Sequence, residues 1–199
     1  MDETIEKSRA YTDAIIKRID REMPVELKRF EAGIARTVMK ARGEPLDKLG
    51  ELYRCIDKVF DFFGKYTPCK KGCSHCCYYK IDVSELEVEY IEEYAGIRRE
   101  LRDIRIFGTH GMPCPFLRGT ECSIYRFRPY ACRKHVNVDA SDYWCHPSRC
   151  NGAFLMLLQS SESKAAYELL VDTERLADIR NYFPLGSWSD YVCGPVRPW

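Results

Sequence analysis

The stretch Pro68-Cys-Lys-Lys-Gly-Cys-Ser-His-Cys-Cys-Tyr78 places four cysteines, Cys69, Cys73, Cys76 and Cys77, within nine residues. Such crowding is typical of a shared metal, and the spacing Cys73-x2-Cys76 lets two sulfurs reach one ion. Neighbouring side chains point to opposite faces of a strand and well apart on a helix, so one ion would rarely take both Cys76 and Cys77. This pair indicates two metal sites, a multinuclear cluster, or one ligand beside a free or structural thiol.

The composition is that of a globular protein without a strong charge. The chain has 199 residues, of which 45% are hydrophobic and 13% aromatic, and its net charge is +1. This length fits one domain, or one domain with an appendage, and the balance of charges gives no general attraction to polyanions. We therefore expect neither a nucleic acid nor a membrane as a partner, and the identity of a substrate or protein partner stays open, as does the oligomeric state.

Neither the N-terminal residues nor the longest apolar run predicts a targeting or membrane-spanning segment. The N-terminus, Met1-Asp-Glu-Thr-Ile-Glu-Lys7, is charged and mixed rather than basic and then apolar, and the apolar run from Ala153 to Leu158 is too short to cross a bilayer. We therefore expect a cytoplasmic protein. Thiols stay reduced in that compartment, so the eleven cysteines favour metal binding over a disulfide framework.

The expected fold is mainly α with small irregular or β elements, in which helices pack around a cysteine-rich metal-binding middle region. The chain divides into an N-terminal helical region (1–66), a cysteine-cluster metal-binding region (67–152) and a C-terminal helix and tail (153–199). No repeat or flexible linker separates these regions. We expect them to form one compact unit.

Helix boundaries follow from apolar spacing and from proline and glycine. Apolar residues spaced at threes and fours predict helices across residues 3–64, with Pro24 and Pro45 near helix starts. The third of these helices is predicted from Leu46 to Phe63, ending at Gly64. Cys55 lies inside it, where we expect a small buried hydrophobe rather than a ligand. A further helix is predicted from Ala165 to Tyr182.

Shorter elements are predicted around the cysteines. Residues 78–83 alternate like a short strand, and Ser84-x-x-Glu87 is a capping box that opens a helix ending at Gly96. The triplet Arg118-Gly119-Thr120 marks a tight turn between two short apolar stretches.

A second group of cysteine motifs follows. It reads Pro113-Cys-Pro-Phe-Leu117, Glu121-Cys-Ser-Ile-Tyr125, Arg128-Pro-Tyr-Ala-Cys-Arg133 and Tyr143-Trp-Cys-His-Pro147. Together with the first stretch, this ordered set resembles the YkgJ-like cysteine-cluster family, over residues 69 to about 150. That family is described as zinc- or iron-chelating and is often labelled iron-sulfur, and a flagellin lysine methylase is similar in its cysteine region.

The resemblance implies a pool of metal ligands, carried over residue by residue. The pool is Cys69, Cys73, Cys76, Cys77, Cys114, Cys122, Cys132 and Cys145. Eight sulfurs could fill two four-coordinate sites or one cluster with spare thiols. The family pattern does not extend with certainty to Cys150, for which ligand and spectator roles are equally open.

Other side chains have supporting roles in this interpretation. Arg128 and Arg133 flank Cys132 and are suited to donate hydrogen bonds to sulfur or to a buried carboxylate. His75 and His146 could each complete a mixed sulfur-nitrogen site of the zinc type, although the cysteines already suffice, and His110 and His135 are weaker candidates. We expect Tyr125 in the core.

Sulfur ligands suit both zinc and iron-sulfur clusters, so the ligand type does not choose between them. The number of cysteines favours an iron-sulfur cluster or another iron centre, with redox activity on an unknown substrate. A zinc-stapled structural or protein-interaction module is the first alternative. The second is a metal-dependent protein-modifying enzyme resembling flagellin lysine methylase. The chain has no Gly-x-Gly-x-x-Gly, Walker-type or Gly-x-Ser-x-Gly motif, so the sequence implies neither a dinucleotide nor ATP as a ligand. Whether the protein is an enzyme stays open.

Overall fold

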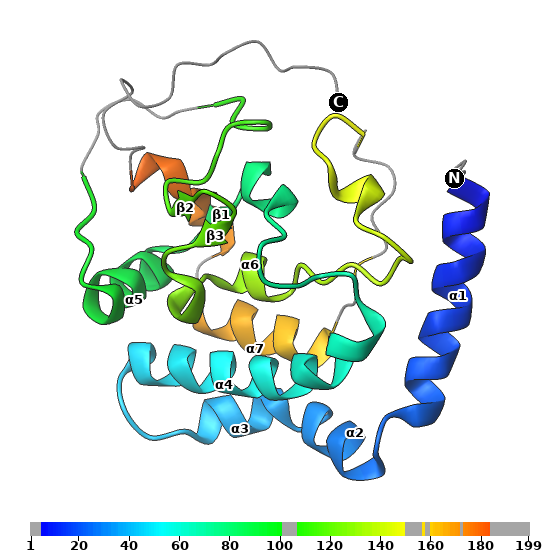
Figure 1. Cartoon of the computed structure of the whole chain (residues 1–199). Helices are drawn as coiled ribbons and strands as arrows, with labels where there is room; N and C mark the ends of the chain where they lie inside the picture. The colour runs from blue at the N-terminus through cyan, green and yellow to red at the C-terminus, as the bar shows by residue number, and fades with distance from the viewer. Residues whose placement is uncertain (1–4, 101–106, 150–156, 158–159, 172, 184–199) are drawn as a thin grey trace.

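A computed structural model describes residues 5–100, 107–149, 157, 160–171 and 173–183, and it is mostly helical with a few short strands (Figure 1). Cys150, most of the apolar run 153–158 and the tail 184–199 lie outside the described residues. In chain order the elements, with η for a 3-10 helix, are α1 (Ile5–Glu22), α2 (Val25–Glu31), α3 (Ile34–Lys40), α4 (Pro45–Phe63), η1 (Gly64–Tyr66), η2 (His75–Tyr78), β1 (Asp82–Val83), α5 (Glu85–Ala95), β2 (Leu117–Arg118), β3 (Glu121–Cys122), η3 (Tyr125–Phe127), α6 (Tyr130–Arg133), η4 (Tyr143–Cys145), α7 (Ser161–Leu170), η5 (Thr173–Arg175), β4 (Ala177–Asp178) and η6 (Ile179–Asn181).

Helix α4 is the centre of the helical half of the molecule. It packs against α3, α5 and α7, and Figure 1 shows α3, α4 and α7 stacked below the short α6. One apolar cluster joins α1, α3, α4, α6 and α7 through buried residues such as Leu52, Ile56, Val138 and Ala166. Burial of a large aliphatic side chain contributes about 1.5–3 kcal/mol, so this shared core holds the helices together.

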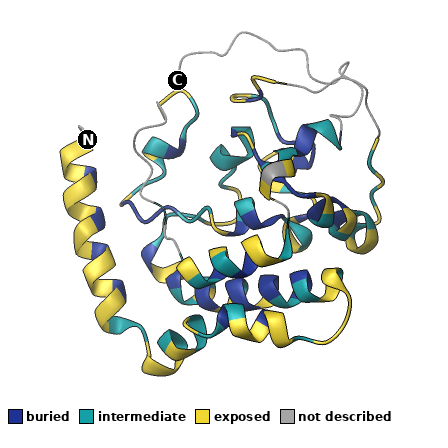
Figure 2. Cartoon of the chain, turned by 180° about the vertical axis from the view of Figure 1, so that it is seen from behind, coloured by how far each residue is buried: buried dark blue, intermediate teal, exposed yellow. Residues whose placement is uncertain are grey.

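Helix α1 lies to one side of this stack and exposes most of its surface (Figure 2). Ile15 and Ile19 form its buried stripe and join the same apolar cluster. Near its start, the buried Ser8 hydroxyl donates a hydrogen bond to the carboxylate of Asp139. The described residues contain no helix whose length and apolar character would let it cross a membrane.

The predicted helix from Leu46 to Phe63 is confirmed as α4, but it is the fourth helix of the chain rather than the third. The segment between Pro24 and Ala41 breaks at Gly33, whose φ of −108° and ψ of 3° are not helical. Glycine has a high entropic cost in a helix, so the chain divides there into α2 and α3.

The predicted capping box is confirmed at the start of α5. The Ser84 side chain accepts a hydrogen bond from the backbone N–H of Glu87, and the Glu87 carboxylate accepts one from the backbone N–H of Ser84 at 2.9 Å. The helix ends at Gly96, whose φ of 69° is a left-handed conformation that glycine adopts without a steric penalty.

The predicted helix from Ala165 to Tyr182 is wrong beyond its first turns. Helix α7 starts four residues earlier, where the Ser160 side chain accepts a hydrogen bond from Ser163 N–H, and ends at Leu170. The chain then extends, and β4 pairs antiparallel with β1. Pairing with a strand nearly one hundred residues away competes with local helix propensity, and periodicity cannot reveal it.

A second apolar cluster supports the cysteine-rich region. Its buried members are Ile81, Val83, Val88, Ile91, Cys114, Phe116, Leu117, Ile124, Ile179 and Phe183. The predicted turn at Gly119 is confirmed, because β2 and β3 form a hairpin there and Gly119 has a φ of 59°. The predicted strand over 78–83 is reduced to β1, since Tyr78 ends η2.

Candidate metal centre

Seven of the eight cysteines predicted as ligands meet around one cavity of about 420 Å³. These are Cys69, Cys73, Cys76, Cys77, Cys114, Cys122 and Cys132. They come from the loop 69–78, from the loop before β2, from β3 and from α6. Cysteines separated by up to 63 positions in the sequence thus line a common cavity.

The rest of the cavity wall is apolar inside and polar at the rim. Ile81, Phe116, Ile124 and Ile179 belong to the second apolar cluster and line the interior. The lining also includes exposed side chains, which mark the opening to solvent: Lys70, Lys71, Thr120, Glu121 and Tyr125. The cavity is therefore open to small molecules.

Backbone hydrogen bonds tie the two cysteine loops together. The N–H of Cys114 donates to the carbonyl of Cys77 at 2.7 Å, and Gly111 N–H donates to the Tyr78 carbonyl at 2.7 Å. Within the first loop, Cys73 N–H donates to the Lys70 carbonyl at 3.0 Å. These bonds fix the relative position of sulfurs that the sequence separates.

The buried carboxylate of Glu87 positions helix α6, which carries Cys132. Glu87 accepts a hydrogen bond from Tyr130 N–H at 2.7 Å, at the start of α6, which carries Cys132. Its carboxylate also accepts from the hydroxyls of Tyr53 at 2.9 Å and Tyr167 at 2.6 Å. Glu87 therefore connects α4, α5, α6 and α7 and anchors the helix of Cys132.

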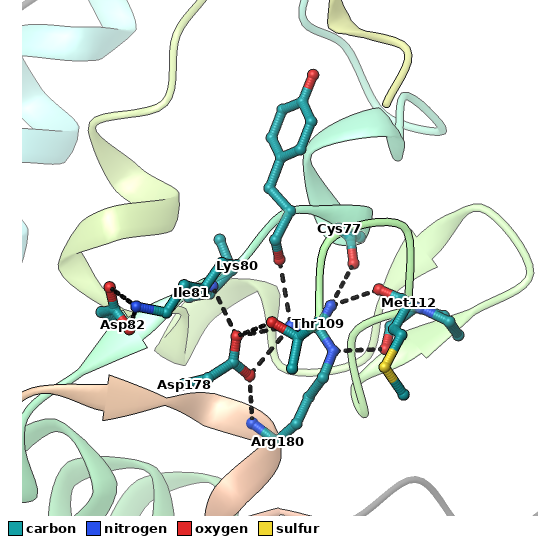
Figure 3. A network of polar contacts seen from close by, with 10 residues as sticks. Cys77, Lys80, Ile81, Asp82, Thr109, Met112, Asp178 and Arg180 are labelled. Atoms are coloured by element: carbon teal, nitrogen blue, oxygen red, sulfur yellow. Dashed lines mark hydrogen bonds and ion pairs between the residues drawn. The ribbon is translucent and has the colours of Figure 1, made fainter. Parts of the chain in front are cut away.

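Arg180 and Asp178 form a buried ion pair that contacts both cysteine loops (Figure 3). The Arg180 guanidinium donates to the backbone carbonyls of Cys77 at 3.2 Å and Pro113 at 3.0 Å, and also to that of Met112. Asp178 accepts from the hydroxyl of Thr109 at 2.7 Å. One side chain from the C-terminal segment thus holds both cysteine loops, a role that no motif in the sequence indicates.

Three of the cysteines accept hydrogen bonds from the backbone two residues further on. Cys73 accepts one from His75, Cys114 from Phe116, and Cys122 from Ile124. Each bond favours the thiolate, which is the form that binds a metal. Burial is the larger effect on all three thiols, and the pKa of each lies above its ordinary value.

Burial opposes ionisation of the same thiols. It raises the pKa of Cys114 to about 11, and it raises the pKa of Cys132 well above the ordinary value. Cys76 and Cys77 share a hydrogen bond that lowers the pKa of Cys76 and raises that of Cys77, and the nearby Arg128 also lowers the pKa of Cys76. A cation within the cavity would reverse the unfavourable effect of burial, since it stabilises thiolates.

Cys145 is buried beside the first cysteine loop but does not line the cavity. Burial, followed by the neighbouring Cys69 and Cys73, raises its pKa to about 12. Its backbone carbonyl accepts a hydrogen bond from the Tyr79 hydroxyl at 2.5 Å.

Asp142 lies near Cys73 and His75, and we call Cys73, His75, Asp142, Cys145 and His146 the outer group. Asp142 Oδ2 lies 3.9 Å from Cys73 Sγ and 3.4 Å from His75 Nε2, and the rings of His75 and His146 are 5.5 Å apart. In the described part of the chain, no three Cys, His, Asp or Glu side chains lie close enough to hold one ion. The role of each cysteine as a ligand stays a prediction.

The two arginines that flank Cys132 differ in position. Arg133 is buried, donates to the Asp57 carboxylate at 2.7 Å and lies over the Tyr53 ring. The Asp57 side chain is half-exposed, so this contact is not the predicted one to sulfur or to a buried carboxylate. Arg128 lines the cavity and lies 4.0 Å from the centroid of the Tyr125 ring. The expectation of a core Tyr125 is wrong, because this side chain is exposed at the rim where it covers Arg128.

The remaining candidates separate by burial. Cys55 is buried in α4 among apolar residues and does not line the cavity, as predicted. His110 is exposed, with its Nε2 atom 3.2 Å from the Pro147 carbonyl. His135, a weaker candidate in the sequence, lines the cavity. The only sequence signal that could have placed His135 at the cavity is its position three residues after Cys132.

The donor set fits zinc or iron, since both accept thiolate and imidazole ligands. The comparison with protein families agrees: residues 68–151 match the family CxxCxxCC, described as "Putative zinc- or iron-chelating domain". Neither the curated proteins nor the solved structures gave a match. The predicted resemblance to a cysteine-cluster family is thus confirmed over residues 68–151, and the match supports metal binding by this region.

Proposed function

We propose that the cysteine cavity holds an iron-sulfur cluster or another iron centre, and that this centre exchanges electrons with a small substrate at the cavity mouth. One observation carries the proposal: seven cysteines line a single cavity of about 420 Å³. When bound, an iron centre of this kind supplies one-electron redox chemistry.

The size of the cavity favours a polynuclear centre. A single zinc ion binds four sulfurs at about 2.3 Å, so its ligands converge on one point. In an iron-sulfur cluster the cysteines bind different irons, and bridging sulfides fill the space between them. A roomy cavity with seven cysteines in its wall suits the second arrangement better.

The charges around the cavity support an anionic occupant. Thiolates around iron carry net negative charge, and the wall contains Arg128, Lys70 and Lys71 but only one acidic residue, Glu121, which pairs with Lys71 at 3.3 Å. Arg128 also lowers the pKa of Cys122, although burial is the larger effect there. These cations would offset the charge of a thiolate-bound centre.

The exposed rim supports a redox role rather than a purely structural one, because an exchange of electrons with a substrate requires access. All nine cysteines among the described residues are free thiols, which a reducing compartment would preserve. A cytoplasmic location is therefore part of this proposal.

A zinc-stapled interaction module is the second candidate. It is favoured by the outer group, where the carboxylate of Asp142 lies near both the thiol of Cys73 and the imidazole of His75. Sulfur, oxygen and nitrogen donors together are typical of zinc. In this case the metal would hold the loops and the helices would contact a protein.

Elemental analysis separates the two candidates. Protein purified without oxygen should be brown and should contain iron and acid-labile sulfide, and its colour should bleach on reduction. Colourless protein with stoichiometric zinc and neither iron nor sulfide would reject the iron centre in favour of the zinc module. A Cys55→Ser variant should contain the same metal as the unmodified protein, because Cys55 lies in the apolar core away from the cavity.

A further inference from the structure

His135 presents an unpaired nitrogen atom on the wall of the cysteine cavity. Its Nε2 atom is buried and has no hydrogen-bond partner in the described part of the chain. A buried polar atom without a partner is unfavourable, so folded proteins pair nearly all of them. A partner for this nitrogen is therefore expected in whatever the cavity binds.

A second unpaired atom lines the same wall. The Nε atom of Arg128 is also buried without a hydrogen-bond partner among the described residues. An N–H of a guanidinium can only donate, so it suits a thiolate or sulfide, whereas a neutral imidazole nitrogen can bind a metal ion. The two atoms thus complement the two components of a metal-sulfur centre.

The imidazole of His135 is available as a ligand at neutral pH. Burial lowers its pKa to about 4, and the neighbouring Lys134 acts in the same direction. The ring is therefore neutral and keeps a lone pair on one nitrogen, which is the form that binds metals.

The ring of His135 rests on a fixed support. It lies against the Tyr79 ring, with centroids 5.5 Å apart and planes inclined at 50°. Tyr79 is held at both ends, since its hydroxyl donates to the Cys145 carbonyl at 2.5 Å and its own carbonyl accepts from Arg180 at 3.2 Å. A ring held in this way loses little further freedom when it binds a metal.

His110 packs against the same tyrosine and provides a natural contrast. Its ring is stacked on that of Tyr79 at 5.5 Å, but it is exposed, does not line the cavity and contacts the Pro147 carbonyl. The two histidines share a neighbour and differ in access to the cysteines.

We propose that His135 Nε2 is a ligand of the metal centre, so that the donor set contains nitrogen beside sulfur. This inference rests on the proposed metal centre and adds a ligand outside the cysteine pattern. A neutral imidazole in place of a thiolate removes one negative charge from the ligand shell and raises the reduction potential of an iron centre.

Cobalt provides a test that does not depend on the native metal. Metal-free protein is titrated with Co²⁺ without oxygen, and pulsed EPR measures coupling between the cobalt electrons and histidine nitrogen, identified by ¹⁵N-histidine labelling. Wild type and H110Q should show the coupling, and H135Q should lose it. H135C should bind as much Co²⁺ as wild type without nitrogen coupling, because cysteine returns a ligand of a different element.

The outcomes are distinguishable. Wild type that binds Co²⁺ without histidine coupling, or H135Q that keeps it, would overturn the assignment of His135 and leave the metal centre intact. Wild type that binds no Co²⁺ and purifies without iron or zinc would overturn both proposals.

Discussion

The guanidinium of Arg180 donates a hydrogen bond at 3.2 Å to the backbone carbonyl of Cys77, which lies 103 residues earlier in the chain. The same side chain reaches the carbonyls of Met112 and Pro113 in the second cysteine loop. Only 2% of the Arg180 and Asp178 side-chain surfaces is exposed, so the pair works in a poorly screened environment. Both cysteine loops are therefore held by a segment that contributes no cysteine of its own to the cavity wall.

Arg180→Met should destabilise the protein by about 3–5 kcal/mol, because it leaves Asp178 charged, buried and without its ion-pair partner. Urea unfolding monitored by circular dichroism measures the change. Adding Asp178→Asn to Arg180→Met should recover part of the loss, since it removes the unpaired charge. The exposed Arg98→Met serves as a control and should stay within about 0.5 kcal/mol of wild type. Equal stability of Arg180→Met and wild type would show that the buried pair is not needed to hold the loops.

Cys132→Ser should lose metal and stability together. Cys132 faces the cavity, and the binding energy of a structural metal contributes directly to folding. Metal content per chain and the unfolding midpoint are measured on the same preparation. Cys55→Ser, buried in α4, should keep full metal content even if its stability falls. A Cys132→Ser protein with undiminished metal would remove this residue from the ligand set.

Metal-free protein should lose stability as the pH rises above about 8.5. The folded-state pKa of Cys114 is about 11 and that of Cys145 about 12. An unfolded thiol ionises near pH 8.5, so this stability is fully present below about pH 8.5 and is lost as the pH rises toward the folded pKa values. Urea unfolding in the presence of a chelator, from neutral to alkaline pH, measures the trend.

The metal-loaded protein should show the opposite dependence at lower pH. Bound thiols are deprotonated, so metal binding must release protons and its affinity should fall as the pH drops below the thiol pKa values. A Zn²⁺ titration in weakly buffered solution measures the protons released. Binding without proton release would contradict ligation by the buried thiols.

Gly72→Ala should cost about 1–2 kcal/mol, because Gly72 has a φ of 88° that an L side chain adopts with strain. The added methyl group would meet Thr120 at an ordinary contact distance of 3.8 Å, so the backbone is the source of the cost. Gly64→Ala is the matched control, since its φ is −52° and nothing lies within 4 Å of the new carbon. It should be neutral or stabilising by up to about 1 kcal/mol. Thermal unfolding of both variants checks the difference, and equal effects would refute the strain at Gly72.

Local sequence signals predicted the elements whose stability depends on their own residues. The capping box at Ser84 and Glu87, the glycine end at Gly96 and the turn at Gly119 each depend on bonds or torsions within a few residues. Helix α4 was also predicted from the sequence, because its apolar residues recur at the helical period. The helix predicted through residue 182 failed, since β4 pairs with a strand far away in the sequence.

Ordered cysteine spacings and apolar periods are properties of neighbouring residues, so the sequence alone predicted the mainly helical fold and the resemblance to a cysteine-cluster family. Tertiary structure alone decided which thiols face one cavity, that Cys145 lies outside its wall, and that His135 and Arg180 belong to the site. The physical reason is that burial, hydrogen-bond pairing and charge compensation depend on residues brought together only when the chain folds.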